Sequence, residues 1–361
     1  MFRIRLSESA MPTGSKDPDV LLAWLLDSMG LVRRKSEGMS IDDEQGALHR
    51  LIRETLLSEP LKGWDTKSLG DASGLSQTGM HHQLVKLRES GLVAAETEGR
   101  WHIHVLRGGS ISAAVDLVSV QARAILDLRL SEVAERVTES DDRMVIPSEE
   151  EGGGFQIEIA EPGATMEGED RLDALMRDLG LNGERGKHND RLARQLFEQI
   201  SSSRRAMTLL ALADKTGDSR SRVQRAVERM RAAGIAERVP MLDRIAQDVY
   251  AGLMRQHDAR GEEWLMTRGG LGRLDESVSK SLIAGVRKKS LNIEKVQDIL
   301  APVPLDAQRV LLNTLGGRMP YGIRISGRDG AAVKERVMRQ ADRTLRRLRT
   351  VAQRLDESLA S

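Results

Sequence analysis

Apolar residues recur every three or four positions along most of the chain, and this spacing predicts a protein built mainly from α-helices. A short amphipathic helix is expected over 17–29, where Asp17 and Pro18 provide a start signal. A much longer helical pattern covers 110–137. Extended runs are few and short, so the expected fold class is mainly α with a small β-hairpin.

The stretch from residue 44 to residue 109 combines several short elements in a definite order. Ser76 can cap a helix that Gly91 ends, and Glu98-Gly99 can form the turn of a hairpin. This is the order of elements in a winged helix-turn-helix: a helix, a short helix, a tight turn, a longer helix and a two-stranded hairpin. The expected elements are a helix through 48–56, a short helix over 67–72, a turn over 73–76, a longer helix over 77–90, and extended runs over 92–97 and 101–106.

The sequence LSQTGMHHQLVKLRESGLV within this stretch resembles prokaryotic transcriptional regulators of the ArsR and MarR type. The resemblance covers residues 48–106 and none of the rest. It implies binding to double-stranded DNA, with the N-terminal part of the 77–90 helix in the major groove. It also implies that the hairpin tip touches the DNA backbone or the minor groove.

The 77–90 helix has an apolar side and a polar side. Met80, Leu84 and Leu87 share one stripe, which is expected to face the core. Gln can read adenine bidentately, Thr can touch a thymine methyl, and Lys can reach phosphate or guanine. The candidate DNA contacts are Ser76, Gln77, Thr78, His81, His82 and Lys86, together with Arg100 at the hairpin tip.

Two other interpretations apply to the same stretch. The module can serve only as a protein-interaction domain, since its polar helix face carries few cations. Zinc binding is the other alternative, because neutral imidazoles bind zinc well and the stretch contains His81, His82, His102 and His104. Adjacent helix residues point about 100° apart, however, and no carboxylate completes a set of ligands, so neither a metal nor another cofactor is predicted.

A second helix-turn-helix is predicted within residues 171–246, where MTLLALADKTGDSRSRVQRAVERMRAAGIAERV repeats the same pattern. Val223, Val227 and Met230 form its inward stripe. A solvated helix with ion pairs to Glu228 is the alternative. No second hairpin is expected, because Pro240 follows and the pattern then turns helical. The candidate DNA contacts on the outward side are Ser221, Arg222, Arg225 and Arg229.

The last helix, expected over 331–359, carries apolar residues at heptad spacing. It predicts either a short coiled coil that forms a homodimer or a helix within an intramolecular bundle. The arginines around it can bind DNA or can pair with an acidic segment over 139–170; in the second case, deleting 149–170 should raise DNA affinity. The heptad positions are Met338, Ala341, Leu345, Leu348, Ala352, Leu355 and Leu359.

The chain of 361 residues is long enough for about two or three domains. Only 2% of the residues are aromatic, so aliphatic side chains and Met must build the cores. The expected divisions are an N-terminal helical extension (1–43), the winged helix-turn-helix (44–109), a connecting helix (110–138), an acidic Gly-containing linker with one extended run at 155–159 (139–170), the second helix-turn-helix (171–246) and a helical region ending in the basic heptad helix (247–361).

Composition narrows the functional classes. Cys is absent, which excludes disulfides and a cysteine nucleophile and fits a cytoplasmic protein. No apolar run is long enough to cross a bilayer, so no membrane partner is expected. No phosphate-binding loop, HExxH or GxSxG motif occurs, and neither a catalytic residue nor an enzyme is predicted. The net charge is +1, so basic patches rather than the total charge would attract DNA.

These patterns favour a transcriptional regulator that binds double-stranded DNA. The alternative is a structural or assembly factor of chromosome segregation or replication. Tandem winged helices in such factors bind protein partners, or bind DNA without strong sequence preference.

Overall fold

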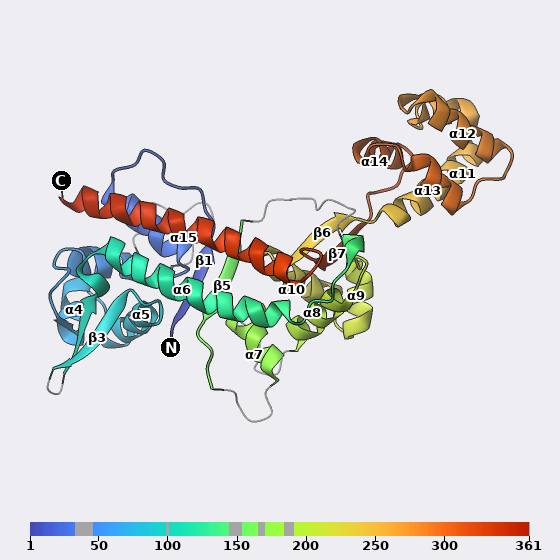
Figure 1. Ribbon diagram of the computed structural model, residues 1–361. Coiled ribbons are helices and arrows are strands. Elements are labelled where there is room, and N and C mark those ends of the chain that lie inside the picture. The colour runs from blue at the N-terminus through green and yellow to red at the C-terminus, as the bar shows by residue number, and fades with distance from the viewer. Residues whose placement is uncertain (33–45, 99–100, 144–153, 165–169, 184–190, 361) are drawn as a thin grey trace.

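The computed structural model describes residues 1–32, 46–98, 101–143, 154–164, 170–183 and 191–360. Within these ranges the protein is mainly helical with small antiparallel sheets, as the sequence predicts. Figure 1 shows an elongated main body with two long helices along it and a separate group of helices at one end. None of the described helices is both long enough and apolar enough to cross a membrane.

The two long helices, α6 (Ile111–Ala134) and α15 (Gly330–Ala360), lie side by side through the main body (Figure 1). They run in opposite directions. Near the end of α6, Asp127 Oδ1 lies 2.9 Å from Lys334 Nζ at the start of α15. At the other end, the carboxylate of Asp356 accepts hydrogen bonds from two backbone N–H groups in the first turn of α6, and so satisfies donors that the helix itself leaves unpaired.

Two short strands, β1 (Arg3–Ser7) and β5 (Gln156–Ala160), form an antiparallel pair next to the long helices, with Arg5 opposite Glu158. Their inward-facing side chains alternate along each strand, as expected for a sheet with one buried face. These buried side chains are Ile4, Leu6, Ile157 and Ile159. The segment over 139–170, expected to be a linker with one extended run, therefore contributes a strand to the core.

Residues 47–106, called the first module, contain the predicted helices and hairpin. Asp65 caps α4 and Ser76 caps α5, each by accepting hydrogen bonds from backbone N–H groups, and Gly74 ends α4 with a left-handed φ of 66°. The strands pair in the order β2-β4-β3. The elements are α3 (Ala47–Leu51), the π-helical η1 (Ile52–Leu56), β2 (Trp64–Asp65), α4 (Thr66–Ser73), α5 (Gln77–Glu89), β3 (Val93–Glu98) and β4 (Trp101–Leu106), and η2 (Arg107–Gly109) then leads into α6.

The second module comprises residues 192–240 and 321–325. Its strands β6 and β7 form an antiparallel pair. The chain turns helical after Pro240, as the sequence predicts, so the two strands are not a local hairpin; the partner strand β7, which the sequence does not predict, lies beyond residues 241–320. The elements are α8 (Leu192–Ser202), α9 (Leu209–Thr216), α10 (Arg220–Ala232), β6 (Ala236–Pro240) and β7 (Tyr321–Ile325).

The sequence from 205 to 215 is helical in its spacing of apolar residues, but α9 starts only at Leu209. Met207 instead exchanges backbone hydrogen bonds with Ile323 on β7 and extends the small sheet. The Thr208 hydroxyl then accepts a hydrogen bond from the Ala211 backbone N–H and caps the helix. Met207 thus occupies the position in the second module that β2 has in the first.

The two modules are an internal repeat. α5 and α10 have the same length, and each follows a short helix that a glycine in a left-handed conformation ends. A constant offset in residue number relates the caps and turns of one module to those of the other. The equivalent pairs are Gly74 and Gly217, Ser76 and Ser219, and Gly91 and Gly234.

The repeat extends beyond the modules to the whole main body. In each half a strand leads to a helix, then to the module and then to a long helix; the first helices are α1 (Pro18–Ser28) and α7 (Arg171–Asp178). Because β1 pairs with β5 and α6 with α15, both in antiparallel fashion, an approximate two-fold axis relates the halves. One buried apolar core includes residues of both halves, from Phe2 to Leu355.

Residues 241–320 form a helical insertion between the paired strands β6 and β7, at one end of the molecule (Figure 1). It has a second apolar core of its own, which includes Val249, Leu282 and Leu312. The expected helical region over 247–361 is thus wrong as a unit, since α15 belongs to the main body. The helices of the insertion are α11 (Leu242–Thr267), η4 (Leu271–Arg273), α12 (Glu276–Arg287), α13 (Ile293–Leu300) and α14 (Leu305–Thr314).

The heptad seam of α15 faces the interior of the chain. Met338, Ala341, Leu345, Leu348, Ala352 and Leu355 are buried, and α15 contacts α6 and α1. The intramolecular interpretation of the seam is therefore confirmed. A homodimer that uses this seam would first have to expose these buried side chains, so the structure does not support that interpretation.

Candidate nucleic-acid interface

The polar side of α5 is exposed, and the side chains that were predicted to contact DNA lie on it. Met80, Leu84 and Leu87 are buried on the opposite side. The Ser76 hydroxyl accepts a hydrogen bond from the Gly79 backbone N–H at 3.2 Å, which fixes the start of the helix. The exposed candidates are Ser76, Gln77, Thr78, His81, His82 and Lys86.

Two further histidines, His102 and His104, lie on strand β4 of the first module in different environments. His102 is exposed, whereas His104 is only 3% exposed, and its Nε2 lies 3.5 Å from Thr66 Oγ1. Burial lowers the pKa of His104, and the charges of Arg88 and His102 lower it further. The described residues contain no group of three or more His, Cys, Asp or Glu side chains that could hold a metal ion. Arg100, the predicted hairpin-tip contact, lies outside the described residues.

On α10, three of the four predicted contacts are exposed: Ser221, Arg222 and Arg225. Arg222 Nη1 lies 2.6 Å from Asp218 Oδ1 in the preceding turn, and Arg225 Nε donates to the Ser221 carbonyl at 3.3 Å. Both guanidinium groups are therefore held near the start of the helix.

Arg229 does not belong to this exposed face. Its Nε donates to the backbone carbonyl of Leu181 at 2.7 Å, and its Nη2 donates to the carbonyl of Asn182 at 3.4 Å. The side chain is half-buried and anchors the loop after α7 to the second module. Its assignment as an outward DNA contact is therefore wrong, and its role in this structure is structural.

The repeat identifies two exposed residues on α10 that reasoning from the sequence missed. Arg220 is equivalent to Gln77, and Gln224 is equivalent to His81. Aligning the two modules on their serine caps, Ser76 and Ser219, would have found them. The first two turns of α10 therefore present Arg220, Ser221, Gln224 and Arg225 where α5 presents Gln77, Thr78, His81 and His82.

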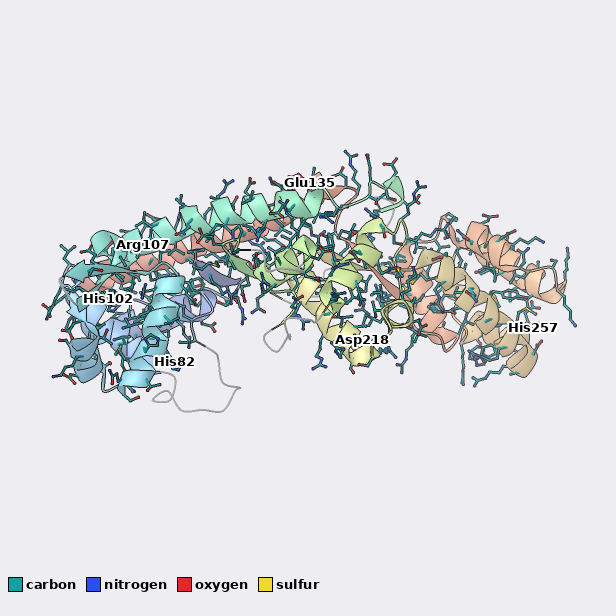
Figure 2. The ribbon with its side chains drawn as sticks, turned by 90° about the horizontal axis from the view of Figure 1, so that it is seen from below. His82, His102, Arg107, Glu135, Asp218 and His257 are labelled. Carbon is teal, nitrogen blue, oxygen red and sulfur yellow. The ribbon has the colours of Figure 1, made fainter. Side chains whose placement is uncertain are left out.

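The two modules differ in charge although they share a fold. Residues 204–231 contain eight basic and three acidic residues, whereas the equivalent residues 61–88 contain four basic and two acidic ones. In Figure 2, His82 on α5 and Asp218 just before α10 both lie on the edge opposite Glu135 at the end of α6. These two residues thus lie on the same edge of the main body in this view, and the second module is the more positive.

The arginines of α15 bind mainly within the protein. Arg347 Nη1 and Arg343 Nη2 lie 2.6 Å and 2.9 Å from the carboxylate oxygens of Glu8, and Arg336 Nη1 lies 2.9 Å from Glu237 Oε2. Arg354 donates to a backbone carbonyl of the segment after β1. The N-terminal segment is thus a partner of these arginines. Several acidic residues of the segment over 139–170, Glu149 among them, lie outside the described residues.

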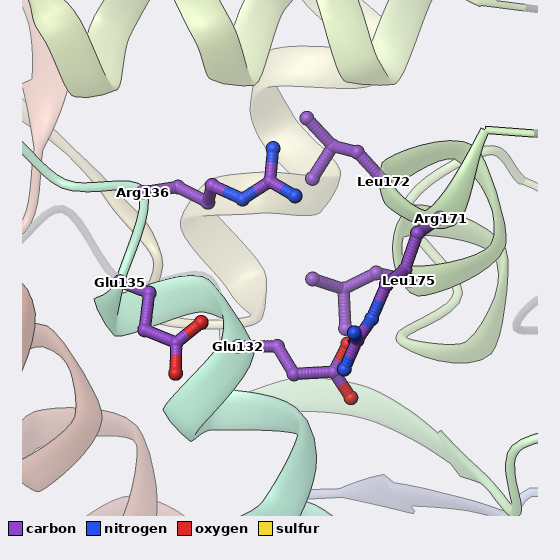
Figure 3. A pocket seen from close by; sticks show the side chains of 6 residues that line it. All are labelled: Glu132, Glu135, Arg136, Arg171, Leu172 and Leu175. Atoms are coloured by element: carbon purple, nitrogen blue, oxygen red, sulfur yellow. The ribbon is translucent and has the colours of Figure 1, made fainter.

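A small pocket lies where the end of α6 meets α7 (Figure 3). Its volume of about 40 Å³ suffices for one or two water molecules but not for a ligand of metabolite size. Arg171 Nε lies 2.9 Å from Glu132 Oε2, so two of the charged residues in its lining pair with each other. The pocket therefore gives no basis for an effector site.

Comparison with known proteins gave no family model, no curated protein and no solved structure that matches this chain. The functional inference therefore depends on the repeat, the exposed residues and their charges.

Proposed function

We propose that this protein binds double-stranded DNA as a transcriptional regulator, with each module acting as a winged helix-turn-helix of the ArsR and MarR type. The observation that supports this proposal is the repeated arrangement of a capped short helix, a glycine turn and a capped longer helix with an exposed polar face. Such a longer helix is the element that enters the major groove in winged helix-turn-helix proteins.

The exposed side chains in the first turn of α5 are suited to contact base edges more than to bind phosphate. Gln77 and Thr78 occupy the first turn, where the helix would approach base edges, and both are exposed. A glutamine can pair bidentately with adenine and a threonine methyl can contact thymine, so an A·T-containing sequence is expected. Each such contact discriminates against a wrong base by about 1–3 kcal/mol.

A second candidate function is supported by the insertion. Residues 241–320 take the place of the loop that would join the two strands of the second wing, and they offer a separate folded surface with its own core. A structural or assembly factor of chromosome segregation or replication would use such a surface for a protein partner. In that case DNA binding would show no strong sequence preference.

Selection from a pool of random duplexes separates these functions. A regulator should enrich a defined sequence, whereas binding that enriches none supports the assembly factor. The variant Gln77→Ala/Thr78→Ala/His82→Ala should lose about tenfold or more in affinity for the enriched sequence while its affinity for random duplex changes little. Thr350→Ala/Gln353→Ala, which truncates two exposed residues of α15, is the matched control and should bind as the unmodified protein does. Failure to bind any duplex would refute both DNA-binding proposals.

A further inference from the structure

We infer that one chain supplies both readers of a DNA site and that this site is not palindromic, with one half read by α5 and an unlike half read by α10. This inference depends on the proposed function. In helix-turn-helix proteins that bind as homodimers, two identical recognition helices read two equivalent half-sites. Here the two helices belong to one chain and differ in sequence.

The main body already forms within one chain the pair of halves that a dimer would form. Its approximate two-fold axis relates β1 to β5 and α6 to α15, and each of these elements is paired with its own equivalent. β1 and β5 pair with each other through their backbones, and the apolar seam of α15 is buried against α6 and α1. The contacts that would hold two subunits together are thus made within one chain.

The two modules have a fixed relative position. One buried core continues from the first half into the second, and protein cores are close-packed and resist deformation. The ion pair between Asp127 and Lys334 and the cap that Asp356 provides also connect the two halves. In Figure 2, His82 on α5 and Asp218, just before α10, lie on the same edge of the body, and two readers of one duplex must share a side.

The equivalent exposed positions of α5 and α10 carry side chains of different chemistry. Gln77 of α5 corresponds to Arg220 of α10, and His82 corresponds to Arg225. Glutamine pairs best with adenine, whereas arginine pairs bidentately with guanine O6 and N7. The half-site under α10 should therefore contain guanine where the half-site under α5 contains adenine. The larger positive charge of the second module should also give it more of the phosphate contacts.

The decisive measurements are the stoichiometry and the symmetry of the selected sequence. Native mass spectrometry of the full chain with the enriched duplex should show one chain per duplex. Selection should give two dissimilar half-sites about 10 bp apart, the spacing that places two helices on one face of DNA. Two chains per duplex, or a palindromic sequence, would overturn the inference while leaving DNA binding itself intact. No binding to any duplex would instead refute the proposed function.

A substitution in α10 makes the test sharper. The variant Arg220→Gln/Ser221→Thr/Gln224→His/Arg225→His gives α10 the exposed residues of α5, and all four positions are exposed. Its selected sequence should become more symmetric, with the guanine-containing half replaced by a copy of the other half. The unchanged circular-dichroism spectrum of this surface variant would establish that it folds. An unchanged selected sequence in the folded variant would show that α10 does not read bases.

Discussion

Replacing Glu237 with Gln should destabilise the main body strongly, because this carboxylate neutralises a buried positive charge. The Glu237 side chain is 7% exposed; its Oε1 accepts a hydrogen bond from Arg324 Nε at 2.7 Å, and its Oε2 accepts one from Arg336 Nη1 at 2.9 Å. The Arg324 side chain is itself 6% exposed. Burial, together with the nearby Arg324 charge, also lowers the pKa of Arg143, so these guanidinium groups lie in one poorly solvated region.

The expected magnitude follows from the burial of this group. Gln retains the shape of Glu but removes the charge, and removing one charge of a buried ion pair costs about 3–5 kcal/mol. For a main body of this size, such a loss lowers the melting temperature by roughly 10 °C. Loss of the Glu237 charge should also loosen the second module, because Glu237 connects β6 to β7 and α15.

The measurement is chemical unfolding followed by circular dichroism, with Glu228→Gln as the matched control. Glu228 also pairs with an arginine, since its Oε2 lies 2.9 Å from Arg231 Nη1, but its side chain is 53% exposed. An exposed pair contributes about 0–1 kcal/mol, so the control should unfold almost as the unmodified protein does. Equal unfolding midpoints for the two variants would refute the reasoning that burial makes the Glu237 charge necessary.

Three further predictions concern the arginines of α10, the buried His104 and the apolar seam of α15. Arg225→Ala should weaken DNA binding and reduce the slope of log affinity against log salt concentration by about 1, as measured by fluorescence anisotropy at several salt concentrations. Arg229→Ala should instead mainly lower the free energy of unfolding. The reverse pattern would contradict the assignment of Arg225 to DNA binding and of Arg229 to the structure. Burial lowers the pKa of His104, so the stability that the neutral imidazole provides is present above the ordinary pKa of 6.5 and is lost as the pH falls below it. The unfolding midpoint should therefore decrease between about pH 7 and pH 5 in the unmodified protein and decrease less in His104→Gln. Leu348→Ala should cost about 2–5 kcal/mol of stability without changing the molar mass in light scattering, since this seam residue is buried within the chain; a change in mass would point to a dimer.

The sequence predicts the first module well because its signals are local. The Ser76 cap, the glycine at position 91 and the stripe of Met80, Leu84 and Leu87 all lie within one helix or next to it. The hairpin strands are close in sequence, and their turn residues stand between them. Each of these signals depends on neighbours a few residues away, so one sequence contains enough information to place them.

The second module was predicted less completely because its partners are distant along the chain. β7 pairs with β6 across the insertion, and no local pattern near Pro240 indicates a strand that starts at Tyr321. The same limit explains Arg229, whose carbonyl partner on Leu181 belongs to a loop that precedes α8. A helical projection gives the direction of a side chain but not the presence of another segment beside it.

The charge difference between the modules has a physical explanation in the single-chain arrangement. In a homodimer every substitution occurs in both recognition helices, so a change that favours guanine in one half-site favours it in the other as well. In this chain α10 can acquire Arg220 and Arg225 while α5 retains Gln77 and His82, because only the buried contacts between the halves must be preserved. Those contacts are the β1–β5 pair and the α6–α15 pair, and they do not include the exposed faces of α5 and α10. Under the proposed function, the two modules can therefore read unlike half-sites while the second also supplies more of the phosphate contacts, and the four-residue substitution in α10 tests this division directly.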